Sequence, residues 1–220
     1  DPARTMHDLI AAGGTVDADK IEGYLTPHPS GVRALLAPVR PDQGEAVGAD
    51  FVRAVIGELR LTNDAVIVDT PPGFTPAVIA AIDSSTSLCV VSTLDSLSLK
   101  NTRVALDTLE LMGYPDESVQ LVLNRADSDV GVTAADVEAL LHRRPDVLIP
   151  SSAGITRAVN EGRPIVASDP DSAAARAFGA LARAYWPAAA APESPVPSTT
   201  AVRWRRPLAP VRWTIRKAAA

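Results

Sequence analysis

The stretch Val66-Ile67-Val68-Asp69-Thr70-Pro71-Pro72-Gly73-Phe74 decides the fold of this chain. Its apolar start predicts a buried strand that ends at Asp69. A rigid turn follows, because two prolines fix φ and Gly73 permits a close backbone approach. In open α/β sheets, ligands bind outside the carboxyl ends of the strands, where a carboxylate can orient Mg²⁺. Asp69 is therefore either a metal-site residue or a simple cap of the next turn.

Further aliphatic runs alternate with helical patterns along the chain. Strands are expected at 65–69, 88–93, 119–124 and 147–150, with a fifth at 32–37. The runs are nearly continuous, which is typical of parallel strands covered on both faces. Helices are expected at 3–11, 48–61, 97–113, 133–142, 152–161 and 170–185. This order predicts an α/β fold with a mostly parallel, doubly wound sheet.

Composition limits the class of protein. The 220 residues are 46% hydrophobic, which is enough for a sizeable core. The single cysteine, Cys89, lies in an apolar run and is interpreted as a buried hydrophobe, so no disulfide forms within the chain. Because the chain also has neither a membrane-length apolar run nor a leader pattern, we expect a soluble, cytoplasmic protein.

The net charge of −5 combines an acidic body with a basic end. Residues 201–220 carry six basic residues and no acidic one, so residues 1–200 hold the other 15 basic and all 26 acidic residues, a net charge of −11. The acidic body argues against direct nucleic-acid binding. We expect an α/β domain over 1–186, an Ala/Pro/Ser linker over 187–200 and a basic, Trp-containing tail over 201–220.

Polar residues follow the last apolar residue of four predicted strands. They are Asp69, Thr93 to Asp95, Asn124-Arg125 and Ser151-Ser152. Each of these alone is explained by a turn or a helix cap. Because the ends of parallel strands share one rim of the sheet, the four together favour a ligand site there.

With these motifs in this order, the chain resembles the MinD/ParA family of deviant P-loop ATPases, most closely its CpaE-type branch, which is associated with pilus assembly. The matching segments, within residues 1–186, are Arg4–Leu9, Leu25–Val32, Val66–Phe74, Leu121–Arg125, Ile149–Ser152 and Ala158–Pro164. The resemblance implies a P-loop NTPase-like fold, ATP and Mg²⁺ as cofactors, and an ATP-dependent homodimer. It further implies ATP hydrolysis that serves a positioning, cell-division or pilus/secretion assembly machinery.

The resemblance also assigns roles to individual residues. Asp69 would be the catalytic residue that holds Mg²⁺ through water, and the backbone of Gly73 would sense the γ-phosphate. The base-binding residues would be Asn124, Arg125, Pro150, Ser151 and Ser152. An amide can donate and accept at once, which suits adenine. The alternative is that Asn124 is a simple turn former at a strand end.

Asp127 and Asp129 form a further acidic pair. They are either a metal pair or a solvated Asx turn, and the lack of additional ligands nearby favours the turn.

The glycine-rich loop with two lysines that holds the phosphates in this family is absent from the sequence. The lysines of this chain are Lys20, Lys100 and Lys217, and none of them lies in a glycine loop. Since the first methionine is Met6, we expect an N-terminally truncated ATPase that is inactive as this fragment. The alternative is a non-catalytic interaction module that kept the fold and lost the phosphate site. A hydrolase or reductase is disfavoured, because their glycine signatures are missing.

The tail segment 203–217 combines two tryptophans with six cations. This composition suits an anionic lipid surface, so peripheral attachment to the inner face of the membrane is one expectation. Pro207 and Pro210 break any long helix there, and a solvated tail is the alternative.

Overall fold

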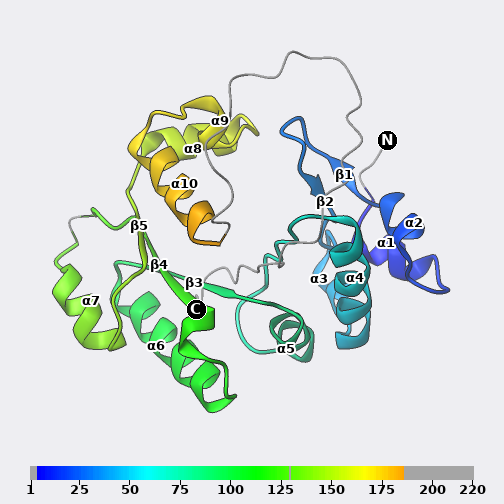
Figure 1. Ribbon diagram of the computed structural model, residues 1–220, viewed down its shortest axis with the longest axis horizontal. Helices are drawn as coiled ribbons and strands as arrows, with labels where there is room; N and C mark the ends of the chain where they lie inside the picture. Colours follow the sequence, from blue (N-terminus) through cyan, green and yellow to red (C-terminus); the bar gives the residue numbers. More distant parts are fainter. Residues whose placement is uncertain (1–3, 129, 186–220) are drawn as a thin grey trace. The chain divides into compact units, whose positions relative to one another are not determined.

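The computed structural model describes residues 4–128 and 130–185, and these form two compact units (Figure 1). The amino-terminal unit comprises residues 4–86 and the carboxyl-terminal unit residues 87–185. The predicted linker and basic tail lie outside the described residues. The assignment of residues 1–186 to one domain stays a prediction.

A parallel sheet forms the centre of the carboxyl-terminal unit. Its strands are β3 (Leu88–Thr93), β4 (Val119–Asn124) and β5 (Val147–Ile149), in the order β3-β4-β5. Their nearly continuous aliphatic sequences are buried at most positions, as expected for strands covered on both faces. The α/β class and the parallel sheet are thereby confirmed.

Helices cover both faces of this sheet (Figure 1). On one face, Cys89, Val122 and Ile149 pack against α10 (Ala173–Tyr185). On the other face, Thr102 of α6 (Ser96–Leu111) donates a 2.9 Å hydrogen bond from its hydroxyl to the Ser92 Oγ of β3. The helix α7 (Ala134–Leu141) packs in turn on α6. Sequential strands and helices therefore build the doubly wound arrangement that the alternation predicts.

Capping residues set the starts of these helices. Asp95 accepts the backbone N–H of Ser98 at 2.7 Å at the start of α6, and Gly113 follows that helix with a φ of 80°. Thr133 and Asp136 form a capping box at the start of α7. The remaining short elements of this unit are η1 (Asp116–Ser118), α8 (Ala153–Asn160) and α9 (Ile165–Ser168).

The amino-terminal unit is built mainly from helices. Its elements are α1 (Met6–Ala11), α2 (Ala18–Glu22), β1 (Thr26–Pro27), β2 (Arg33–Ala34), α3 (Pro41–Gly44), α4 (Ala49–Thr62) and α5 (Pro76–Asp83). Two small cores hold them together: Leu9 with Ile21 and Val55, and Ile56 with Val66 and Ala81. Helix α5 was not predicted from the sequence, although Thr75 and Pro76 are a typical N-cap and first-turn pair.

Two strand predictions in this unit are wrong. Residues 65–69 form no strand, and no described strand pairs with them. Val66 is buried, whereas Ile67 is 72% exposed, so only one side of this segment is covered. The physical reason is that an apolar run becomes a strand only when a neighbour completes its hydrogen bonds.

The strand expected at 32–37 is only two residues long. It is β2, which pairs antiparallel with β1 and not within the parallel sheet, and one further parallel bridge joins Thr5 to Leu36. Pro27 lacks an N–H, which limits how far this pairing extends. Among the described helices, none combines the length and the apolar character needed to cross a membrane.

Candidate functional site

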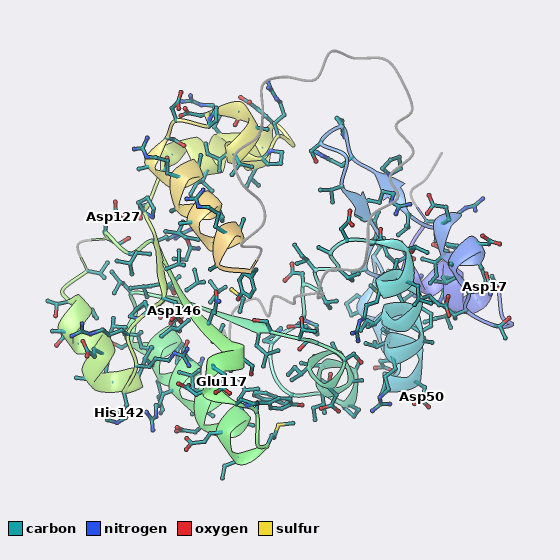
Figure 2. The ribbon with its side chains drawn as sticks, viewed as in Figure 1. Asp17, Asp50, Glu117, Asp127, His142 and Asp146 are labelled. Carbon is teal, nitrogen blue, oxygen red and sulfur yellow. The ribbon has the colours of Figure 1, made fainter. Side chains whose placement is uncertain are left out.

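The candidate site lies at the carboxyl ends of the three parallel strands. In the register of the sheet, Asn124 stands between Thr93 and Ile149, which are the last residues of the neighbouring strands. Figure 2 shows Asp127 beyond this end of the sheet, whereas Asp146 and Glu117 lie toward the opposite end. The loops after β4 and β5 therefore meet at one rim, as the sequence pattern predicts.

Asn124 is held in one orientation by its own chain. Its Oδ1 accepts the backbone N–H of Arg125 at 3.0 Å. Arg125 has a φ of 55°, a left-handed conformation that turns the chain sharply after the strand. Because the oxygen of Asn124 is engaged, its amide group keeps two N–H donors, which can bind an acceptor on a ligand.

The loop that contains Pro150, Ser151 and Ser152 lies beside this turn. Ala126 donates its backbone N–H to the carbonyl of Ile149 at 3.0 Å, which continues the β4–β5 pairing past the ends of the strands. Ser152 accepts the N–H of Gly154 at 3.1 Å and so begins α8. The structure thus brings together all five residues that the resemblance assigns to the base.

Asp127 contacts the loop that follows β5. Its Oδ1 accepts the backbone N–H of Ser151 at 2.5 Å, and this bond spans 24 residues of sequence. The same N–H group holds the pKa of Asp127 below its ordinary value. Asp129 lies outside the described residues, so both interpretations of the acidic pair, the metal pair and the Asx turn, stay predictions. Among the described residues, no acidic or histidine cluster could hold a metal ion.

Thr93 and Asp95, the third polar group on this rim, act as a helix cap. Thr93 donates its hydroxyl to Asp95 at 2.5 Å, and its backbone N–H binds the Ser98 Oγ at 3.1 Å. These contacts join the end of β3 to the start of α6. A helix cap therefore explains Thr93 and Asp95 without a ligand.

The turn after Asp69 belongs to the amino-terminal unit. Asp69 is exposed, and Gly73 has a φ of 89° with open space where a Cβ would stand. The hydroxyl of Thr70 is buried and makes no hydrogen bond with any described group. A carboxylate, a hydroxyl and backbone groups are hard oxygen donors, so this turn fits a Mg²⁺ ion that keeps most of its waters.

The predicted residues are thus divided between the two units. Asp69 and Gly73 lie in the amino-terminal unit, and the base-site residues lie in the carboxyl-terminal unit. Two contacts were not predicted from the sequence: that of Asp127, and that of Ser128, whose hydroxyl lies 3.0 Å from the hydroxyl of Ser151. The feature of the sequence that could have indicated these contacts is the position of Asp127 and Ser128 shortly after β4, close to the loop that follows β5.

Sequence comparison finds relatives of one kind, although no family model matches the chain. A putative septum site-determining protein MinD from Emiliania huxleyi is 27% identical over 172 residues, which are 75% of this chain and 59% of the relative. The chloroplastic MinD homologue of Arabidopsis thaliana is 28% identical over 120 residues, or 52% of this chain and 36% of the relative. The chain therefore spans less than two thirds of the length of either relative.

Solved structures show the same fold. A ParA family ATPase from Chlorobium tepidum superposes with a TM-score of 0.73 at 18% identity, over 82% of this chain and 77% of that one. The cell division ATPase MinD of Pyrococcus furiosus gives a TM-score of 0.68 at 25% identity, over 83% and 75%. MinD of Pyrococcus horikoshii, solved with Mg-ADP, gives 0.69 at 22% identity, over 84% and 74%.

These similarities agree with the order of motifs and with the parallel sheet of the carboxyl-terminal unit. The chain is homologous to the MinD/ParA family of ATPases and has its P-loop NTPase-like fold.

Proposed function

We propose that this chain carries the adenine-binding and metal-binding parts of a MinD/ParA-type ATPase. The observation that carries the proposal is the rim of the β3-β4-β5 sheet, where the Asn124 turn and the loop 150–152 are joined by hydrogen bonds. Ligands in open α/β sheets bind at such rims. The relation to MinD and ParA proteins supports adenine as the base.

Each proposed role follows from a group that the chain supplies. Asn124 donates its amide N–H groups to the base, Arg125 lies beside it, and the loop 150–152 packs on the ring. In the amino-terminal unit, Asp69 holds the metal through water, and the backbone of Gly73 contacts the terminal phosphate. A bound Mg²⁺ would neutralise charge on the phosphates.

A titration with free nucleosides tests the base site in the chain as it exists. Adenosine at millimolar concentration is expected to shift the NMR amide signals of residues 124–126 and 150–152, with smaller shifts for guanosine. Asn124→Ala should weaken adenosine binding by about 1–3 kcal/mol, the cost of an unpaired polar partner. Equal responses to both nucleosides in the parent and in Asn124→Ala would contradict the proposal.

The second candidate is a non-catalytic interaction module, and one observation favours it. The sequence contains no glycine-lysine loop, and residues 1–200 carry a net charge of −11, which repels a triphosphate. Joining such a loop segment ahead of Asp1 distinguishes the candidates. Mg²⁺-dependent ATP binding by the joined protein supports the ATPase, and its failure in a folded protein supports the module.

We extend the proposal to the intact ATPase and to the segment 203–217. The intact ATPase forms an ATP-dependent homodimer and serves a positioning or pilus/secretion assembly machinery of the CpaE type, and the chain is inactive without its phosphate loop. The segment 203–217, which lies outside the described residues, attaches to anionic lipid. Sedimentation with anionic liposomes tests the attachment, which should require this segment and weaken at high salt.

A further inference from the structure

Three hydrogen bonds connect the loop after β4 with the end of β5 and the loop that follows it. The segment 126–128 after β4 contacts Ile149, the last residue of β5, and Ser151 in the following loop through three hydrogen bonds. Ala126 supplies a backbone N–H, Asp127 a carboxylate, and Ser128 a hydroxyl. The three bonds fix the second loop relative to the first in position and in register.

The carboxylate bond is the strongest of the three contacts. An ionised acceptor gives shorter and stronger hydrogen bonds than a neutral one, and the distance from the Asp127 Oδ1 to the Ser151 nitrogen is 2.5 Å. Both residues are exposed, so the bond does not serve to satisfy a buried group of the core. The bond ties Asp127 to the loop that contains Pro150, Ser151 and Ser152.

We propose that Asp127 is a positioning residue for base recognition, because it holds the loop 150–152 at a fixed place beside Asn124. This inference rests on the proposed adenine site. Asp127 itself does not touch the base. It acts through the backbone of Ser151, and loss of the carboxylate lets the loop move away from the ring.

Amide hydrogen exchange at Ser151 tests the contact in the full chain without any ligand. Asp127→Ala should raise the exchange rate of this one amide roughly 10- to 100-fold, as expected for loss of a bond to a charged group. Asp127→Asn keeps an oxygen acceptor and should retain most of the protection. Asp64→Ala is the matched control, since it removes one exposed carboxylate from the other unit.

Nucleoside titration of the same four proteins tests the positioning role. Asp127→Ala should bring the affinities for adenosine and guanosine closer together and reduce the shifts at residues 150–152, whereas Asp127→Asn and Asp64→Ala keep the parental preference. A merely structural contact would not change this preference. An unchanged preference in Asp127→Ala, with faster exchange at Ser151, therefore overturns the positioning role.

The remaining outcomes separate this inference from the proposed function. Unchanged exchange at Ser151 in Asp127→Ala overturns the role of Asp127 and leaves the adenine site standing. No response of the parent chain to either nucleoside overturns the adenine site and the positioning role together.

Discussion

Residues 119–124 and residues 65–69 have the same sequence pattern but differ in structure. Both are aliphatic runs that end in a polar residue, Asn124 or Asp69. The first is the central strand β4, paired on both sides, with Leu121 fully buried. The second pairs with no described strand and leaves Ile67 exposed. An apolar run therefore specifies the capacity to form a strand, and the neighbouring strands decide whether it forms.

The largest expected effect is the difference between alanine substitutions in these two segments. Leu121→Ala should lower the free energy of unfolding by about 2–5 kcal/mol, because it opens a cavity in a packed core. Ile67→Ala should change it by less than about 0.5 kcal/mol, since the side chain is already in water. Urea unfolding followed by circular dichroism measures both, and equal losses would show that residues 65–69 are packed as tightly as β4.

The next largest loss of stability is expected at two helix caps, one in each unit. Asp95 caps α6 after β3, and Thr75 caps α5 after the turn that follows Asp69. Asp95→Ala should cost about 1–2 kcal/mol, and Thr75→Ala about 0.5–1 kcal/mol. The Asp95 carboxylate is a charged acceptor and lies 2.7 Å from the backbone nitrogen of Ser98. The Thr75 hydroxyl is a neutral acceptor and lies 3.3 Å from the backbone nitrogen of Val78, so its hydrogen bond is weaker. The same urea measurement applies, and the reverse order would contradict this ranking.

Lowering the pH should loosen the rim. The pKa of Asp127 is below 3.8 because it accepts the Ser151 N–H, so the contact is complete above the ordinary pKa. It is lost as the pH falls through the lowered value, when the carboxylate is protonated. The amide signal of Ser151 should titrate in this window in the parent and stay constant in Asp127→Asn, and a transition above 3.8 would contradict the assignment.

The smallest expected effect is that of nucleotide on the chain as it stands. Millimolar Mg-ATP should not raise the melting temperature beyond the effect of Mg²⁺ alone, because stabilisation requires a ligand concentration well above Kd. The sequence supplies no lysine loop to offset the phosphate charge. A clear rise with Mg-ATP in a thermal melt would show that a competent phosphate site exists in this chain.

Local patterns predicted the parts of the fold that local chemistry specifies. The three strands of the carboxyl-terminal unit and the helix expected at 133–142 are confirmed. The missing strand at 65–69 could not be foreseen, since pairing depends on segments distant in sequence. The helix α5 carried a readable signal in Thr75 and Pro76, which the preceding proline-rich turn obscured.

The candidate site was predictable to a similar degree. The rim location of Asn124 follows from the end of an aliphatic run, because parallel strands finish at one edge. The bond from Asp127 to Ser151 was not predictable, since it depends on the register of β4 and β5.

Hydrolysis of ATP by a form of the protein with a glycine-lysine loop segment joined ahead of Asp1 tests the central claim most directly. Mg²⁺-dependent hydrolysis is predicted for the parent and for the control variant Asp64→Ala. This control removes an exposed carboxylate that lies close to Asp69 in the sequence. Asp69→Ala should abolish hydrolysis while the circular dichroism spectrum stays that of the parent. A folded Asp69→Ala protein that hydrolyses ATP at the parental rate would contradict the account.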